Sequence, residues 1–292
     1  MPPYLILSVI SLCFFSASII TFRLTAKHAM PNPYAWFFWY FLIYFILGLF
    51  LPFFTPIKIV PLDVRALSFN VPYAIAIYIG IFCFAQAIYR LDVTTMGPLS
   101  NWGNVFTPLL AFLVLGEKLP FQNIPWLILI VVAGIFAAYD ERLKVKSFFN
   151  KYVYLFLVFV FCLSVTRIAA NRGINSVGFW NFTFYEFFYG SIGLLIITPF
   201  IYKKIKVNIK PILFMIPAVV LEFLGLLAIL KAFSYQVIIP AIISSIPLGS
   251  VIAFVISRYD SKLLEYHPLK TYAIRFLGIF LMTVGLIILA IR

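Results

Sequence analysis

Long apolar runs follow one another along almost the whole chain. A helix of about 20 apolar residues spans the hydrocarbon core of a bilayer. The runs are continuous and do not alternate between apolar and polar positions, as the strands of a membrane barrel do. The expected helices are 4–22, 34–54, 67–88, 93–115, 121–139, 152–171, 179–201, 211–230, 237–257 and 272–290. The pattern predicts an all-α polytopic membrane protein with ten transmembrane helices.

The most polar link between these helices, residues 140–151, lies in the middle of the chain. It separates a first unit of five expected helices, 1–139, from a second, 152–292. The remaining links are short, so we expect no soluble domain.

The two units share features in the same order. Residues 98–112 align with residues 240–254 at an offset of 142, and each stretch begins with proline and ends with an Ala-Phe pair. Pro52 and Pro199 close the second helix of each unit. Because five is an odd number, the second unit must insert upside down relative to the first. The sequence therefore predicts two inverted five-helix repeats, a symmetry that supports alternating access around a central site.

Composition agrees with a membrane protein. The chain is 64% hydrophobic and 11% charged, against about 45–50% and about 25% in soluble domains. Its net charge is +13, but the basic residues gather between the apolar runs. Membrane topology and anionic lipid therefore explain this charge better than nucleic acid does. We expect a multi-pass protein of the cell (inner or plasma) membrane, with the lipid bilayer as partner and without bound nucleic acid, metal or cofactor.

Loop charge gives an orientation. The odd-numbered links hold 14 Lys and Arg, whereas the even-numbered links and the termini together hold 6. The positive-inside rule then places the odd links in the cytoplasm and both termini outside.

Ionisable residues inside the apolar runs are the first candidates for a site, because each costs about 2.5–3.5 kcal/mol at a helix centre. Glu222 lies near the middle of helix 211–230 and is expected to carry a proton or to meet a cationic substrate. The alternative is a protonated Glu222 that joins neighbouring helices by a hydrogen bond. Glu186 and Arg167 either form a structural ion pair or clamp the substrate. Arg275 is expected to extend to the membrane interface.

Helix 93–115 is unusually polar for a spanning segment. Asn101 and Asn104 share one face at spacing i, i+3, with Trp102 between them. Ser244 and Ser245 lie in the corresponding helix of the second unit. Proline-interrupted segments in both halves point to a central transport site, although the same polar groups could serve helix packing. Gln86 and Tyr78 are weaker candidates for the cavity wall.

A resemblance to a known family rests on residues 97–98, Gly-Pro, and 105–119, VFTPLLAFLVLGEKL. This stretch resembles the proline-bearing helix and Leu-Gly-Glu turn of EamA-type members of the drug/metabolite transporter (DMT) superfamily. Gln122 and Gly134 also fit, whereas the second unit has Ser-Arg-Tyr-Asp at 257–260 in place of Leu-Gly-Glu. The resemblance implies transport of amino acids, other small metabolites or toxic amphiphiles. It also implies cytoplasmic termini, against the loop charge.

The sequence thus predicts a secondary transporter of a small organic metabolite, an amino acid or similar solute, with export favoured. The chain has no catalytic constellation and no phosphate-binding glycine loop, so we expect no enzyme and no nucleotide-driven pump. The alternatives are a lipid or amphiphile flippase and a membrane-embedded transferase. Proton coupling and the choice between monomer and dimer stay open.

Overall fold

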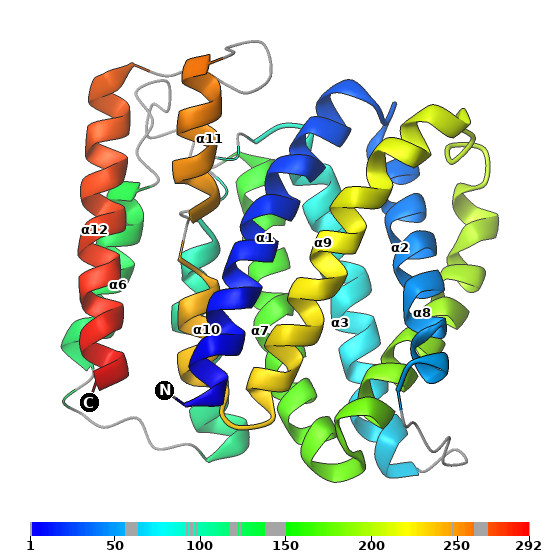
Figure 1. Ribbon diagram of the computed structural model, residues 1–292, viewed down its shortest axis with the longest axis horizontal. Coiled ribbons are helices and arrows are strands. Elements are labelled where there is room, and N and C mark those ends of the chain that lie inside the picture. The colour runs from blue at the N-terminus through cyan, green and yellow to red at the C-terminus, as the bar shows by residue number, and fades with distance from the viewer. Residues whose placement is uncertain are drawn as a thin grey trace.

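The computed structural model describes residues 2–55, 64–91, 93, 96, 99–116, 122, 124–137, 150–246, 248–259 and 268–291. Helices are the regular secondary structure of these residues, and they form one bundle (Figure 1). Residues 140–149 of the expected linker, the Gly-Pro pair at 97–98 and Glu117 of the Leu-Gly-Glu turn lie outside the described residues. The fold is therefore all-α, as expected.

The principal helices run nearly parallel or antiparallel to one another. They are α1 Pro3–His28, α2 Pro33–Leu49, α3 Val64–Ile88, α5 Gly103–Leu110, α6 Ile124–Ala137, α7 Lys151–Val177, α8 Phe179–Ile201, α9 Ile209–Phe233, α10 Ile238–Ser244, α11 Leu248–Tyr259 and α12 Leu269–Ile291. Within the described chain, seven helical segments are long and apolar enough to cross a membrane. A polytopic membrane protein is therefore supported, while the count of ten stays a prediction.

Two expected helices are interrupted. Helix 237–257 divides into α10 and α11, which begins directly after Pro247. Proline has no N–H to donate and disfavours helical geometry in the residue before it. Helix 93–115 ends in a 3₁₀ turn, Ser100–Trp102, then α5, then a π-helical turn, Ala111–Leu115. The two polar segments therefore place irregular backbone inside the bundle.

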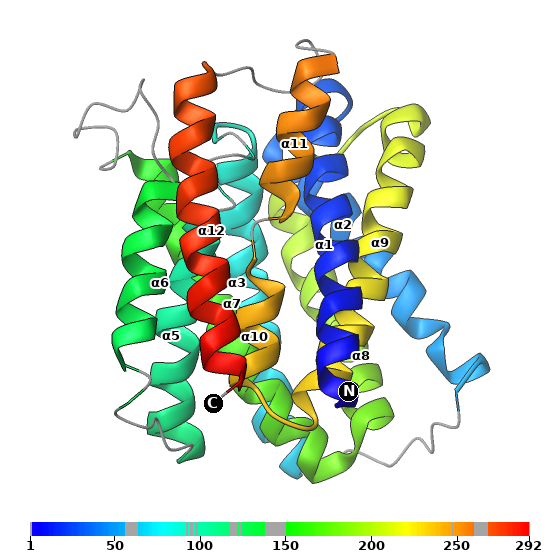
Figure 2. The same ribbon diagram turned by 60° about the vertical axis from the view of Figure 1, so that its left-hand side comes forward.

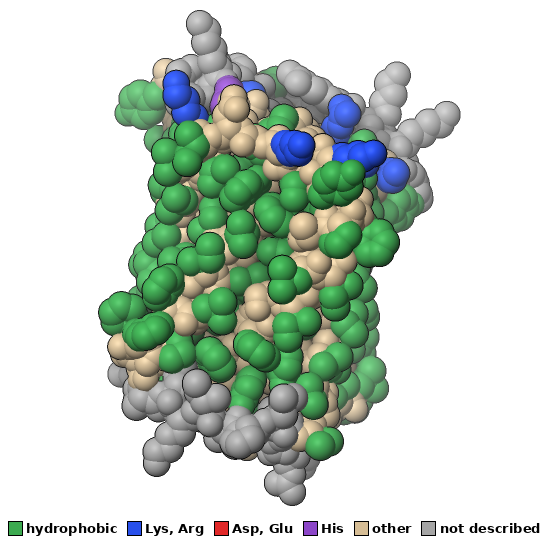
Figure 3. All heavy atoms as spheres, turned by 90° about the vertical axis from the view of Figure 1, so that its right-hand side faces the viewer, with side chains coloured by type: hydrophobic (Ala, Val, Ile, Leu, Met, Phe, Trp, Pro, Cys, Tyr) green, Lys and Arg blue, Asp and Glu red, His purple; other side chains and the backbone are tan. Residues whose placement is uncertain are grey.

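Apolar side chains cover the flank of the bundle. Leu195 and Phe200 on α8 are 72% and 85% exposed, and Figure 3 shows hydrophobic side chains over this face between its two ends. Lys and Arg gather at one end of that face, where the α8–α9 link carries Lys203, Lys204 and Lys206. Both termini lie at the other end of the bundle (Figure 1). The surface is that of a protein surrounded by lipid.

Helices from the two halves of the chain pack directly against one another. α1 lies along α9 and α3 lies along α7 in the middle of the bundle, whereas α2 with α8 and α6 with α12 form its two edges (Figures 1 and 2). The halves therefore interlock and share one core.

Glycines fit these interfaces in reciprocal fashion. A Cβ added to Gly48 on α2 would lie 2.0 Å from the ring of Phe187 on α8. One added to Gly190 on α8 would lie 2.3 Å from the ring of Phe45 on α2. The glycines are 142 positions apart, and so are the two phenylalanines. On each helix the glycine, which has no side chain, therefore leaves room for a phenylalanine ring of the other helix.

The two central interfaces repeat this arrangement. A Cβ on Gly80 of α3 would lie 3.0 Å from Cys162 and 3.5 Å from Phe159 of α7. A Cβ on Gly225 of α9 would lie 2.8 Å from Phe15 of α1. The α3–α7 and α1–α9 pairs are therefore close-packed at equivalent points.

Candidate functional site

A cavity of about 200 Å³ lies at the centre of the bundle. Its walls come from both halves of the chain, on α1, α2, α3, α7, α9, α10 and α11. Aromatic side chains form much of the lining: Phe15, Phe22, Trp36, Tyr40, Tyr44, Tyr73, Phe84, Phe156, Phe159 and Phe233. The interior is therefore apolar, with a few polar groups set into it.

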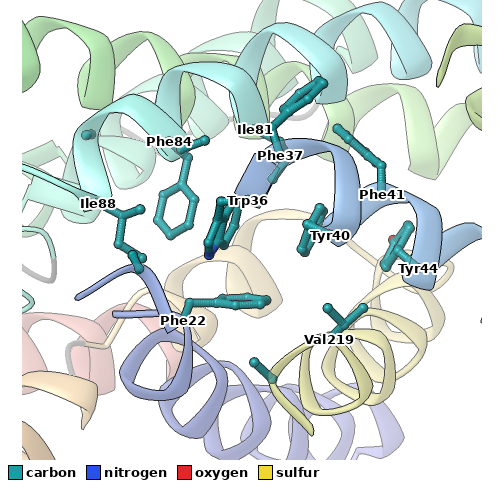
Figure 4. Packing of buried hydrophobic residues seen from close by; sticks show 14 of the residues in the cluster. Phe22, Trp36, Phe37, Tyr40, Phe41, Tyr44, Ile81, Phe84, Ile88 and Val219 are labelled. Atoms are coloured by element: carbon teal, nitrogen blue, oxygen red, sulfur yellow. The ribbon is translucent and has the colours of Figure 1, made fainter. Parts of the chain in front are cut away.

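One wall is an aromatic row on α2. Asn32 caps this helix by accepting from the backbone N–H groups of residues 34 and 35, and spacing i, i+4 then places Trp36, Tyr40 and Tyr44 on one face. Neighbouring rings stack with centroids 5.2 and 5.5 Å apart. Phe22 of α1 packs edge-on against Trp36 (Figure 4). Stacked rings hold this wall rigid and present two tyrosine hydroxyls.

Glu222 reaches the cavity from the middle of α9. Its Oε2 accepts a hydrogen bond of 2.6 Å from the Ser18 hydroxyl of α1. The close packing of α9 on α1 brings the two side chains together. Glu222 keeps part of its surface accessible, so its carboxyl can meet a solute.

Arg167 lines the cavity from α7. Its guanidinium donates to the Thr107 hydroxyl of α5 at 3.1 Å, and Thr107 in turn donates to Ser164 at 3.0 Å. The structural ion pair considered between Arg167 and Glu186 is not formed, because each side chain has a different partner. The guanidinium therefore adds positive charge to a wall that also carries a carboxyl.

Glu186 lies behind the cavity wall. It is 2% exposed and is not among the lining residues. The hydroxyl of Tyr44 donates to its Oε1 at 3.2 Å, and Tyr73 of α3 interacts with the same carboxyl. Both tyrosines line the cavity, so they separate Glu186 from any solute there.

The two interrupted segments meet beside the cavity. Ser244 and Ser245 line it, and the Ser245 hydroxyl donates to Oδ1 of Asn104 at 2.8 Å. Asn104 therefore reaches the cavity through Ser245. Asn101 points elsewhere, since its amide contacts the sulfur of Met282 on α12 at 3.1 Å.

The remaining candidates lie away from the cavity. Trp102 is 37% exposed on the outside of the bundle, and Gln86 is half-buried but is not a lining residue. Tyr78 donates to the carbonyl of Gly190 and so joins α3 to α8. Arg275 is 2% exposed, so the expectation that it extends to the interface is wrong.

Sequence reasoning missed four residues of the cavity wall: Ser18, Tyr40, Tyr44 and Tyr73. The sequence does not single out Ser18, because its partner Glu222 is 204 positions away along the chain. Tyr40 and Tyr44 lie in a segment made almost entirely of apolar and aromatic residues. The spacing of Trp36, Tyr40 and Tyr44 was the one available signal for a cavity-facing row.

Comparisons with known proteins give the fold and no more. No protein-family model and no curated protein matches the chain. A solved structure described only as the crystal structure of a protein is similar over 96% of this chain and 94% of that chain. Its TM-score is 0.66 and its sequence identity is 11%. The arrangement of helices is therefore shared with an experimentally determined structure, at an identity too low to carry a function.

Proposed function

We propose that the protein is a secondary transporter that moves a small organic metabolite by alternating access around the central cavity. The observation that carries the proposal is the pair Glu222 and Arg167 on the cavity wall. Opposite charges inside a membrane-spanning bundle are costly, and they mark substrate or ion pathways. Their partners are the hydroxyls of Ser18 and Thr107, which leaves both free to engage a charged solute.

The packing supports an inverted repeat as the basis of the mechanism. The reciprocal glycine contacts relate the halves at offsets of 142 and 145, close to the offset of 142 in the proline segments. Repeats of opposite orientation can exchange conformations and so open a central site to each side in turn. Ten spanning helices, and membership of the EamA-type transporters, belong to the same proposal.

Cavity size and lining suggest the kind of solute. At about 30 Å³ per water, 200 Å³ corresponds to roughly seven waters, less than the 300–1,000 Å³ of a drug-sized pocket. A carboxyl, a guanidinium and an aromatic wall suit a solute with both charges and an apolar part. An amino acid or similar zwitterion fits this description.

Thermal-shift binding on purified protein tests the proposal. Amino acids, polyamines and nucleotides are screened, and the compound with the largest shift is then followed into proteoliposomes. We expect Glu222→Gln to remove the shift. Thr198→Val is the matched control, because its hydroxyl bonds to Leu194 within α8 and lies off the cavity. A shift that survives Glu222→Gln, or the absence of carrier-mediated flux, would contradict the proposal.

A further inference from the structure

We propose that Glu186 is a second proton-binding site, held behind the cavity wall and connected to the cavity through the hydroxyl of Tyr44. This inference rests on the proposed transport function and names the coupling ion as a proton.

Glu186 is enclosed by groups that suit a neutral acid. Its Oε1 accepts from Tyr44, whereas Oε2 has no hydrogen-bond partner in the described part of the chain. An ionised carboxylate that is buried with the hydroxyls of Tyr44 and Tyr73 as its described partners is expensive, whereas the neutral acid keeps its proton at little cost. The carboxyl of Glu186 is therefore a place for an exchangeable proton.

The ionisable neighbours of Glu186 come from each helix around it. α2 supplies Tyr40 and Tyr44, and α3 supplies Tyr73. The charge of Glu222 on α9 is close enough to act electrostatically on Tyr40 and Tyr73. Arg167 of α7 is bonded to Thr107 instead. Tyrosine and carboxyl groups therefore surround Glu186, and none of the contacts described for it is with a cation.

Tyr44 connects Glu186 to the cavity. Its hydroxyl donates to Glu186, its side chain lines the cavity, and its ring is stacked on that of Tyr40 with planes 17° apart. A tyrosine hydroxyl donates one hydrogen bond and accepts others, so it can receive a proton as it releases its own. Tyr44 can therefore exchange protons between Glu186 and water in the cavity.

The transfer balances with one water of the cavity. The Tyr44 hydroxyl turns from Glu186 to that water and releases its proton to it, and the Tyr44 oxygen then accepts the proton of Glu186. Tyr44 ends with the hydroxyl it began with, Glu186 becomes the carboxylate and the water becomes hydronium. No electron is exchanged.

The two carboxyls lie at different depths. α8 begins, and α9 ends, at the end of the bundle that carries the termini (Figure 1). At 1.5 Å rise per residue, Glu186 lies about 10 Å along α8 from that end, and Glu222 about 17 Å along α9 from it. Measured along its helix, Glu186 is therefore nearer to that end than Glu222 is, so a proton entering from the side of the termini would travel a shorter way to Glu186.

Infrared difference spectroscopy of the purified full-length protein tests the proton site directly, with protons and deuterons as the probe. The wild type is expected to show two protonated-carboxyl bands. Glu186→Gln removes one of them and Glu222→Gln removes the other. Tyr44→Phe is expected to shift the Glu186 band and to slow its hydrogen–deuterium exchange about tenfold, as expected when one hydrogen bond of ordinary strength is lost. The control is Tyr89→Phe, which removes a comparable bond to the Met30 carbonyl and should leave both bands unchanged.

The outcomes are separable. If Glu186→Gln fails to fold, the band that remains in Glu222→Gln reports Glu186, and Tyr44→Phe is then tested in that background. Absence of a protonated Glu186 band at every pH, or exchange that Tyr44→Phe leaves unaltered, overturns the inference. The infrared measurement needs no solute, so a negative result there contradicts the proton site and not the proposal of transport. A thermal-shift screen in which no solute binds would contradict the proposal of transport and not the proton site.

Discussion

Position 44 in the first half of the chain and position 186 in the second stand at the same place in the packing of α2 against α8. The offset of 142 that relates Gly48 to Gly190 and Phe45 to Phe187 also relates Tyr44 to Glu186. One half presents a phenol there and the other a carboxylic acid. The two side chains meet in a hydrogen bond.

The cavity wall shows the same difference. The offset of 145 that relates Gly80 to Gly225 pairs Ile77 with Glu222, and both residues line the cavity. At both of these pairs of positions the packing is shared, whereas the acid stands in the second half. We infer that the common framework fixes the bundle and that departures from it supply the chemistry.

The largest effect is expected from removing the carboxyl of Glu222, which stands on the cavity wall where the first half of the chain has Ile77. Glu222→Gln should lower flux at least about 100-fold, as expected from losing a buried charged contact of nearly 3 kcal/mol. Flux into proteoliposomes measures it. The swap Ile77→Glu/Glu222→Ile sharpens the comparison. Recovery of solute binding by the swap would show equivalent wall positions, whereas a complete loss would show that the acid is required on α9.

A test of the shared framework comes next. Gly48→Ala and Gly190→Ala each force a methyl group into an aromatic ring. Overpacking of this kind costs about 1–3 kcal/mol. Thermal unfolding in detergent should show similar losses for both variants, with Ile196→Ala on the exposed face of α8 as the control. A loss in one variant alone would mean that the two interfaces are not equivalent.

A smaller effect is expected at the partner of Glu222. Ser18→Ala removes the 2.6 Å hydrogen bond to its carboxyl. Bonds to charged groups contribute about 1.5–3 kcal/mol, so solute affinity should fall about tenfold or more. Isothermal titration measures it. Ser191→Ala is the control, because Ser191 is half-buried, bonds within α8 and does not line the cavity. Unchanged affinity in Ser18→Ala would remove Ser18 from the site.

The smallest effects separate two asparagines on one segment. Asn104→Leu should weaken solute binding, since Asn104 holds Ser245 at the cavity. Asn101→Leu should lower the unfolding temperature through its lost contact with Met282 and leave binding nearly unchanged. Each change is expected to be about 1 kcal/mol. Both asparagines were candidates for the site from the sequence, and equal losses of binding in the two variants would contradict the difference expected here.

The sequence predicted the helices best where apolar runs have clear ends. The expected span 179–201 coincides with α8, because Gly178 precedes it with a positive φ and a charged link follows it. The break between α10 and α11 was not predicted as two helices, although Pro247 marks it. Hydropathy over a window does not detect a lost backbone hydrogen bond.

The site was predicted in part. Glu222 and Arg167 stood out because charges are rare in apolar runs, and both line the cavity. The aromatic row on α2 did not stand out, since nearly every neighbour is also apolar and no face can be selected. Arg275 was placed wrongly from the sequence. Its position near a helix end suggested an exposed side chain, whereas packing against the rest of the bundle buries it. Which side chains meet across the bundle is decided by tertiary packing.

The bond between Ser245 and Asn104 limits how the bundle can open. It joins the two interrupted segments, one from each half of the chain, and both residues are buried. Pulling these segments apart would leave the amide oxygen of Asn104 without this donor, at a cost of about 1–3 kcal/mol, whereas the Ser245 hydroxyl keeps its bond to the Ile242 carbonyl. Separation becomes easy only when an incoming molecule or its hydration water donates to that amide oxygen. Without such a molecule, the two interrupted segments are therefore expected to stay together.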